Sequence, residues 1–495
     1  MDNKNGGIYD ASTLGKPKMI ILGIQHMFAM FGATILVPII TGLDISTTLL
    51  MAGLGTLLFH IITKFKVPAF LGSSFAFLGG YAAVKALAPE GTDPNLMLPY
   101  ACLGVAVAGL VYLVLAAIIK FIGIEKVMKF FPPVVTGPII IAIGLGLAPS
   151  AVSNCTTNWF LALVALAVII IFNIWGKGMA KIIPIILGLL ISYGVGLVLY
   201  FIAEANPQLI SEVPWLFSGG TNEAGEFVKI FDFSELNTIF SNIANGQIFG
   251  SEGLIGIPIH WEQTVFGGID YSNGSVIASA IIAIVPISLA TMMEHIGDIA
   301  AISSTVGINY IREPGLHRTL TGDGLATTMA SLFGGPANTT YGENTGVLAL
   351  TKVYDPKVIR IAAVFAVCIS FVPCVSAIIG SIPSCIIGGI SFVLYGMISA
   401  IGVRNVVENH VDFTKSRNLI IAAVILVCSL GLSSDTVSFA IGSAQITLSP
   451  LAVASIAGII LNAIFPGKDY KFNAGDTVNA DDTVDAGDTV NADKK

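Results

Sequence analysis

The chain contains 495 residues, of which 54% are hydrophobic and only 11% are charged, and its formal net charge is −7. Soluble domains carry about 25% charged residues, so this composition excludes a water-soluble globular protein. The acidic residues are concentrated in one loop and in the C-terminal tail, so the net charge identifies no partner, and nucleic-acid binding is not expected.

Apolar stretches long enough to cross a membrane recur along almost the whole chain. A hydrocarbon core about 30 Å thick requires about 20 apolar residues per helix. This pattern predicts an all-α polytopic membrane protein with fourteen transmembrane spans. In chain order the predicted spans are 19–40, 45–63, 69–87, 98–120, 130–148, 157–175, 182–203, 276–306, 317–334, 340–353, 357–380, 383–402, 417–433 and 447–465.

A long polar segment separates the first seven spans from the last seven. Because seven is an odd number, two copies of such a unit would be inverted relative to each other in the membrane. Pro68-Ala69 and Pro336-Ala337 open the third and tenth spans, which is weak support for a repeat. The predicted organisation is an N-terminal segment (1–16), a first seven-span repeat (17–203), an extracellular loop (204–275), an inverted seven-span repeat (276–466) and a disordered acidic tail (467–495).

The basic residues determine the predicted orientation. Lys and Arg concentrate in the loops on the cytoplasmic side of a membrane. Of the 24 basic residues in this chain, only Lys85 and Lys229 fall at or near the outer face of the predicted spans. Both termini are therefore expected in the cytoplasm.

The third and tenth spans differ from ordinary lipid-facing helices because they are polar and are interrupted by Gly and Pro. Short, interrupted segments at corresponding positions of two halves indicate the binding site of a carrier, where an extended backbone meets a half-helix. We expect short extended segments in both spans. Backbone donors near Phe75 and Gly342 would then be available to ligand oxygens.

Ionisable residues cluster in the apolar spans. Glu294 and Asp298 lie one turn apart in the eighth span, Asp323 lies near the start of the ninth, Glu343 lies in the tenth and His26 in the first. A charge at the centre of a span costs at least about 2.5–3.5 kcal/mol, so such residues rarely occur without a role. Two carboxylates in one dry cavity do not both ionise easily, which leads to the hypothesis of proton coupling.

Structural roles compete with several of these assignments. His26 could be satisfied by packing within the bundle, Asp323 could cap the start of the ninth span, and Phe75 would be a core residue in an unbroken helix. His60 and Lys85 are interpreted as structural or interfacial.

An intramembrane metalloenzyme and a gated channel are the alternatives from other functional classes. Glu294, His295 and Asp298 could in principle bind a metal, but no HExxH motif is present, and His295 is turned about 100° away from its two neighbours on the helix. The six cysteines show no metal-binding spacing. Neither a metal nor a cofactor is therefore expected, and paired half-spans with buried carboxylates favour a carrier over a channel.

Five motifs carry a family resemblance. They are GIQHMFAMFGATILVP (23–38), PAFLGSSFAF (68–77), MEHIGD (293–298), EPGLHR (313–318) and NTTYGENTGVLALTKVY (338–354). Over about residues 15–466 the chain resembles the nucleobase–cation symporter-2 family, also called the nucleobase–ascorbate transporters.

The resemblance implies uracil import by cation symport across a bacterial cell membrane. It implies a core domain of spans 1–4 and 8–11, and a gate domain of spans 5–7 and 12–14 that also forms a homodimer. Glu294 and Glu343 would hold the pyrimidine, backbone amides at Phe75 and Gly342 would meet its carbonyls, and Tyr341 would adjoin them. The hydrogen-bonding groups of uracil fit these residues, because its flat ring carries two N–H donors for the carboxylates and two carbonyl acceptors for the backbone amides.

Two positions depart from the proton-coupled uracil carriers of this family. Asp298 stands where those carriers have histidine, and Asp323 stands where they have asparagine; purine carriers resemble this chain at both positions. However, purine carriers usually have the pair Gln-Asn where this chain has Glu343 and Asn344, so at this position the chain differs from them. Uracil is therefore the expected substrate and xanthine or urate the alternative, with the proton as the expected coupling ion and Na⁺ as the alternative.

Overall fold

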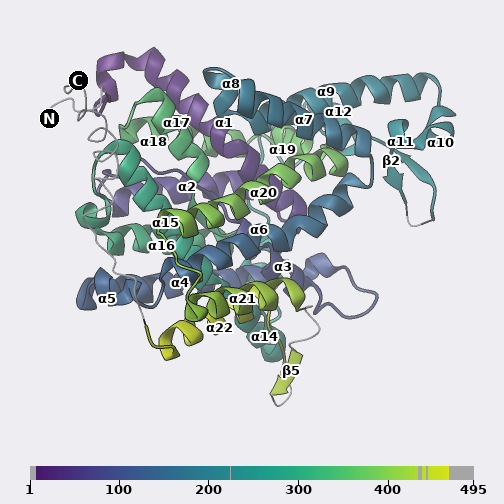
Figure 1. Ribbon diagram of the computed structural model, residues 1–495. Coiled ribbons are helices and arrows are strands. Elements are labelled where there is room, and N and C mark those ends of the chain that lie inside the picture. Colours follow the sequence, from purple (N-terminus) through teal and green to yellow (C-terminus); the bar gives the residue numbers. More distant parts are fainter. Residues whose placement is uncertain (1–6, 223, 433–437, 442–443, 468–495) are drawn as a thin grey trace, which may run out of the picture.

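The computed structural model describes residues 7–222, 224–432, 438–441 and 444–467, and its elements are mainly helices (Figure 1). The expectations for residues 1–6 and for the acidic tail from residue 468 onward lie outside the described residues. In the first half the main helices are α1 (Lys16–Thr41), α2 (Ile45–Ile62), α3 (Leu78–Lys85), α4 (Leu98–Ile122), α6 (Pro133–Cys155), α7 (Trp159–Trp175) and α9 (Pro184–Ala205), with the short α5 (Ile124–Met128) and α8 (Met179–Ile182) between them.

The second half contains a comparable set of helices. They are α14 (Gly274–Ile284), α15 (Ser288–Val306), α16 (Leu316–Leu332), α17 (Gly342–Thr351), α18 (Pro356–Ser370), α19 (Pro373–Gly380), α20 (Ser384–Glu408), α21 (Ser416–Gly431) and α22 (Pro450–Ile464). Among the described residues, seven helical segments are long and apolar enough to cross a bilayer, or eight if α18 and α19, which bend by 87°, form one broken span. The chain is therefore a multi-pass membrane protein, and the number fourteen stays a prediction.

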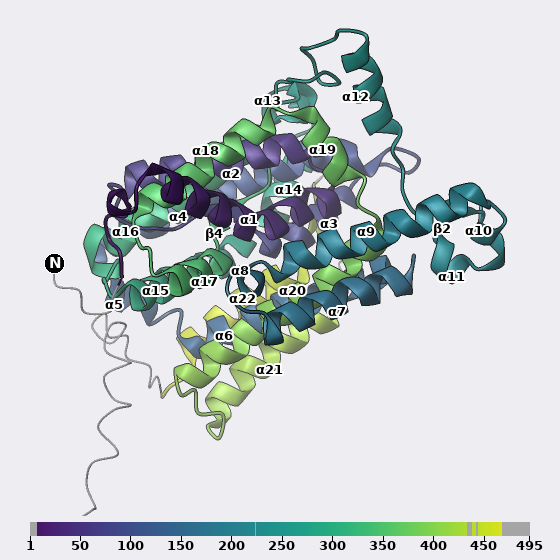
Figure 2. The ribbon, with the colours of Figure 1, turned by 90° about the horizontal axis from the view of Figure 1, so that it is seen from above.

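The helices pack in two groups (Figure 2). One contains α1, α2, α4, α15, α16, α17 and α18, and the other contains α6, α7, α9, α20, α21 and α22. Within the first group, α4 and α16 approach closely at Gly109 and Gly324, where an added Cβ on either glycine would lie 2.7 Å or less from the carbonyl oxygen of the other. Such close backbone contact requires residues without a side chain, and it encloses the neighbouring Asp323.

The extended segments predicted in the third and tenth spans are present and pair with each other. Strand β1 (Leu71–Ser73) runs antiparallel to β4 (Asn338–Thr340), with Leu71 opposite Thr340. The Asn338 amide donates to the Met51 carbonyl oxygen at 2.9 Å, and the Thr56 hydroxyl accepts from the Leu71 N–H at 2.9 Å. Helix α2 thus supplies the hydrogen bonds that hold this two-stranded ribbon inside the helical bundle.

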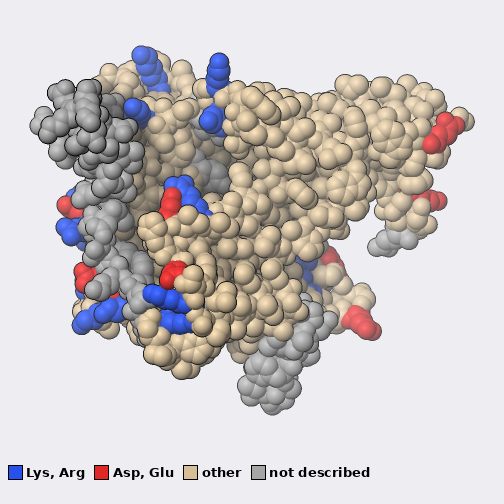
Figure 3. Space-filling model, in the orientation of Figure 1, with Lys and Arg blue, Asp and Glu red and all other residues tan. Residues whose placement is uncertain are grey.

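The segment between the two halves has its own small structure. It contains α10 (Leu209–Glu212), α11 (Pro214–Phe217), β2 (Ser218–Thr221), β3 (Phe227–Lys229), α12 (Ser234–Ala244) and α13 (Val265–Gly268). Lys229 pairs with Glu204 at the end of α9. On the face shown in Figure 3, Lys and Arg gather over the half that carries α5 and α8, whereas only acidic residues mark the tip near α10 and α11.

An N-terminal segment, residues 7–14, packs on the connection between α17 and α18. Ile8 pairs with Val353, and the Ala11 N–H donates to Asp355 Oδ2 at 2.8 Å. The other Asp355 oxygen accepts from the Lys357 N–H at 2.9 Å and so caps the start of α18. Hydrogen bonds from Ser12 and Lys357 lower the pKa of the exposed Asp10 carboxyl.

Replacing Asp355 with alanine should release this segment. The change removes a helix cap, whose loss costs about 1 kcal/mol, together with the bond to Ala11. The thermal midpoint of the detergent-solubilised protein should fall, and trypsin should cleave faster after Lys18. Asp10→Asn is the control, because it weakens only exposed contacts and should change both readouts less. Unchanged trypsin cleavage in Asp355→Ala would contradict this interpretation.

Candidate functional site

Each of the two paired strands is followed by a helix that begins inside the bundle. After β1, Phe75 begins a 3₁₀ turn (Phe75–Phe77) that leads into α3, and after β4, Gly342 begins α17. The residues before them, Ser74 and Tyr341, are extended. The first N–H groups of a helix have no acceptor within it and favour electronegative partners, so both ends suit carbonyl or carboxylate oxygens.

Helix α15 carries two carboxylates, and one of them, Asp298, lies beside the start of α17. Glu294 and Asp298 are both half-buried and lie one turn apart. Asp298 Oδ2 accepts a hydrogen bond from the Thr340 hydroxyl at 2.8 Å. Asp298 Oδ1 lies 3.8 Å from the position that a Cβ on Gly342 would occupy. The start of α17 therefore lies beside a carboxylate.

Asp323 does not cap the ninth span, so the capping alternative was wrong. A π-helical turn ends at Gly315, whose positive φ of 100° separates it from α16, and α16 begins at Leu316. Asp323 is two turns further along and has no exposed surface. It lies within electrostatic range of Asp298 and Glu294. The structure thus brings Asp298, Glu294 and Asp323 together.

His295, which the sequence analysis named only as a potential metal ligand in the metalloenzyme alternative, also belongs to this site. Its side chain is fully buried, and its Nδ1 lies 3.3 Å from Asp323 Oδ2 and 3.3 Å from Thr340 Oγ1. As the helical angle predicts, the His295 side chain points away from Glu294 and Asp298. It points toward α16, where it meets Asp323. The MEHIGD motif contained the signal, because a histidine between two acidic residues in an apolar span also needs a partner.

Phe75 contacts the second group of helices. Its ring meets the ring of Tyr395 on α20 edge to face, with centroids 6.0 Å apart. Tyr395 is 2% exposed, and no local pattern distinguished it from other core residues. Tyr341 supports β1, because its hydroxyl donates to the Ser73 carbonyl oxygen at 2.9 Å and accepts from Thr34 at 3.2 Å. The Phe75–Tyr395 contact therefore joins the two helix groups, whereas Tyr341 holds β1 in place.

Two predicted residues are not joined to this cluster by a described contact. His26 is fully buried in α1, and neither ring nitrogen has a hydrogen-bond partner among the described residues. Glu343 follows Gly342 in α17, but its side chain lies outside the part of the chain that the structure describes.

His60 has a structural role, since its Nε2 meets the Ala69 carbonyl oxygen at 2.9 Å, and Lys85 donates to the Thr41 carbonyl oxygen at 3.1 Å.

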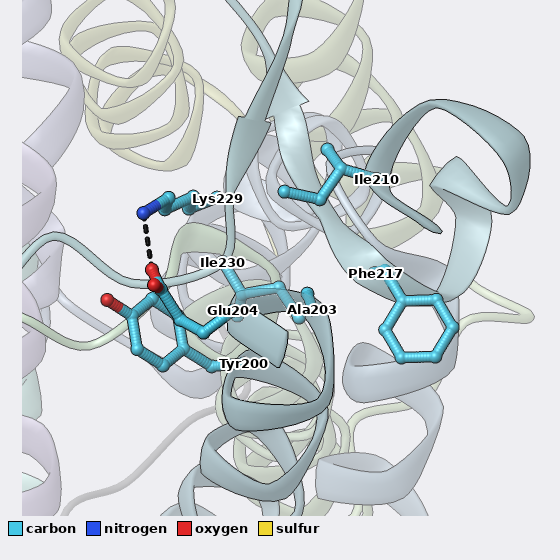
Figure 4. A pocket seen from close by; sticks show the side chains of 7 residues that line it. All are labelled: Tyr200, Ala203, Glu204, Ile210, Phe217, Lys229 and Ile230. Carbon is cyan, nitrogen blue, oxygen red and sulfur yellow. Dashed lines mark hydrogen bonds and ion pairs between the residues drawn. The ribbon is translucent and has the colours of Figure 1, made fainter. Parts of the chain in front are cut away.

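A small pocket lies elsewhere, at the end of α9. Figure 4 shows its lining residues, which include Tyr200 and the Glu204–Lys229 ion pair. None of the candidate residues lines it. Within the described ranges, no group of three or more His, Cys, Asp or Glu side chains could hold a metal ion.

Comparison with known proteins identifies relatives over nearly the full length. The model of a family described as "Permease family" matches residues 17–438. The uracil permease of Bacillus caldolyticus is 40% identical over 472 residues, covering 93% of this chain and 94% of that protein. The uracil permease of Bacillus subtilis (strain 168) is 38% identical, covering 90% of this chain and 92% of that protein.

A solved structure supports the fold. The transmembrane domain of BicA, a cyanobacterium bicarbonate transporter, matches 92% of this chain and 99% of that chain with a TM-score of 0.56. The sequence identity is only 13%, so this likeness concerns the fold alone. The relatives found by sequence are named as permeases, not as enzymes.

Proposed function

Because this chain belongs to the permease family, we propose that it imports uracil across the cell membrane of a bacterium, by proton symport with alternating access. The observation that carries this proposal is the position of Asp298 on α15, beside the start of α17 and hydrogen-bonded to the last residue of β4. The names of the relatives favour uracil over the alternative, a xanthine or urate symporter.

The arrangement suits the hydrogen-bonding pattern of uracil. Carboxylates accept from N–H groups, so Glu294 and Glu343 bind the ring nitrogens in our proposal. Backbone N–H groups at Phe75 and Gly342 donate to the carbonyl oxygens. The Phe75 and Tyr341 rings, both buried, supply apolar surface for a flat heterocycle.

Proton coupling is assigned to the acidic cluster. Asp298, Glu294 and Asp323 share one region of low polarity, where three ionised carboxylates would repel one another. A proton bound there reduces this repulsion and can travel with the substrate. His26 is included because it is buried in a core helix, and Na⁺ is the alternative coupling ion.

The transport cycle that we propose uses fourteen spans in two inverted repeats. The antiparallel pairing of β1 with β4 supports this, because equivalent segments of inverted repeats would meet in that way. Spans 1–4 and 8–11 form the core domain, and spans 5–7 and 12–14 form the gate domain and the homodimer contact. The concentration of Lys and Arg in alternate loops of the predicted spans supports a cytoplasmic location for both termini.

Uptake into proteoliposomes tests the function. Labelled uracil should accumulate under an inward proton gradient, and the accumulation should collapse when a protonophore dissipates the gradient. Unlabelled uracil should compete, whereas xanthine and urate should not. Competition by purines without uracil uptake would favour the alternative substrate, accumulation that requires Na⁺ would replace the proton, and non-saturable flux would indicate a channel.

A further inference from the structure

The Thr340 hydroxyl contacts both His295 and Asp298 of α15. It is the last residue of β4, and it lies opposite Leu71 in the two-stranded ribbon. Its hydroxyl donates to Asp298 Oδ2 at 2.8 Å, and the same oxygen lies 3.3 Å from His295 Nδ1. A hydroxyl can donate one hydrogen bond and accept another at the same time, so Thr340 can bridge His295 and Asp298.

The other neighbour of His295 Nδ1 is Asp323 Oδ2, also at 3.3 Å. Beyond this contact, neither Asp323 oxygen has a hydrogen-bond partner among the described residues, and both side chains are fully buried. A proton on Nδ1 therefore faces two acceptors at equal distance, a carboxylate on α16 and a hydroxyl on β4. The stronger acceptor receives the hydrogen bond.

The protonation of Asp323 decides which acceptor that is. Ionised Asp323 draws the Nδ1–H toward α16. When Asp323 binds a proton it becomes a weaker acceptor, and the Nδ1–H turns to Thr340 Oγ1. A hydroxyl that accepts a hydrogen bond becomes a better donor, so the bond from Thr340 to Asp298 strengthens.

We propose that Thr340 is a positioning residue that transmits protonation of Asp323, through His295, to Asp298 at the start of α17. This inference rests on the proposed function, because it explains how a buried proton site acts on the place where uracil binds. The proton stays on Asp323, and only hydrogen bonds are exchanged along the relay. Substrate affinity then depends on pH through Thr340, although this residue does not titrate.

Helices α2 and α4 also pack around His295. Helix α2 contributes the Phe59 ring, with its centroid 6.3 Å from that of His295. Helix α4 contributes Tyr112, whose hydroxyl donates to Thr291 at 2.5 Å. The titratable groups facing His295 and Asp323 are Glu294 and Asp298 on α15 and Tyr112 on α4. Among the described contacts, the Thr340 hydroxyl alone touches both His295 and Asp298.

The test compares Thr340→Val, Thr340→Ser and the wild type in proteoliposomes. KM for uracil and the proton-driven accumulation ratio are measured between about pH 5 and pH 8. Thr340→Val should make KM insensitive to pH and reduce accumulation roughly tenfold, the scale of one hydrogen bond to a charged group, while gradient-free uracil exchange continues. Thr340→Ser retains the hydroxyl and should restore the wild-type pH profile.

Thr327→Val is the matched control. Thr327→Val also removes a hydroxyl, which in the wild type donates to the Asn338 carbonyl oxygen on the same strand at 2.5 Å, and none of the described hydrogen bonds of Thr327 reaches a carboxylate. Its pH profile should remain that of the wild type. If Thr327→Val also flattens the profile, the effect comes from weakening β4 and the relay is overturned.

The other outcomes separate the two proposals. A wild-type protein that transports no uracil overturns the proposed function. Uracil transport by the wild type together with an unchanged pH profile in Thr340→Val overturns the relay alone. If Thr340→Val does not fold, Asp323→Asn replaces it, since a permanently neutral side chain should also make KM insensitive to pH; a wild-type profile in that variant likewise overturns the relay.

Discussion

Glu294→Gln should lower the affinity for uracil by roughly 10- to 100-fold and remove measurable uptake. A hydrogen bond to a charged acceptor contributes about 1.5–3 kcal/mol, and the amide also presents a donor where the ring N–H needs an acceptor. Helix α15 holds Glu294 one turn before Asp298, so the substitution leaves the backbone of the site in place. Calorimetric titration in detergent and uptake into proteoliposomes measure the two effects.

Glu90→Gln serves as the control for this variant. Glu90 is exposed in the loop after α3, so the same loss of one carboxylate should leave affinity and uptake unchanged. Wild-type uracil affinity in Glu294→Gln would mean that the substrate binds elsewhere in the bundle. Lost affinity in both variants would point to net charge rather than to a contact.

Gly72→Ala should abolish transport by displacing Tyr341. A Cβ on Gly72 would lie 2.4 Å from Tyr341 Cε2 and 2.7 Å from Thr34 Oγ1, which is closer than atoms can approach. Tyr341 immediately precedes the start of α17, and its hydroxyl bonds to Thr34 and Ser73. The ring must move, and the half-helix N-terminus moves with it. Overpacking of this kind costs about 1–3 kcal/mol, so the thermal midpoint should fall as well.

Gly79→Ala provides the comparison within the same broken segment. Gly79 lies in α3, and an added Cβ would meet no atom within 4 Å. Alanine favours a helix over glycine by about 0.5–1 kcal/mol, so this variant should transport normally and unfold at the same or a slightly higher temperature. Normal uptake by Gly72→Ala would show that the position of Tyr341 is not critical.

The amino-acid sequence alone determined the class of protein and the segments that matter. Apolar stretches interrupted by polar loops predicted a multi-pass membrane protein because a helix must match the thickness of the bilayer, and this was confirmed. Gly and Pro in an apolar segment predicted the extended stretches that β1 and β4 contain. The cost of burying charge drew attention to Glu294, Asp298 and Asp323, whose structural surroundings could then be described.

Only the tertiary structure decided which of these residues meet. The contact of His295 with Asp323, the bridge from Thr340 to Asp298 and the contact of Phe75 with Tyr395 each join different helices or strands. Local sequence patterns report which face of an element avoids water, but not which distant element covers that face. For this reason the direction of His295 could be read from helical periodicity, while its partner depended on the close packing of α16 against α4.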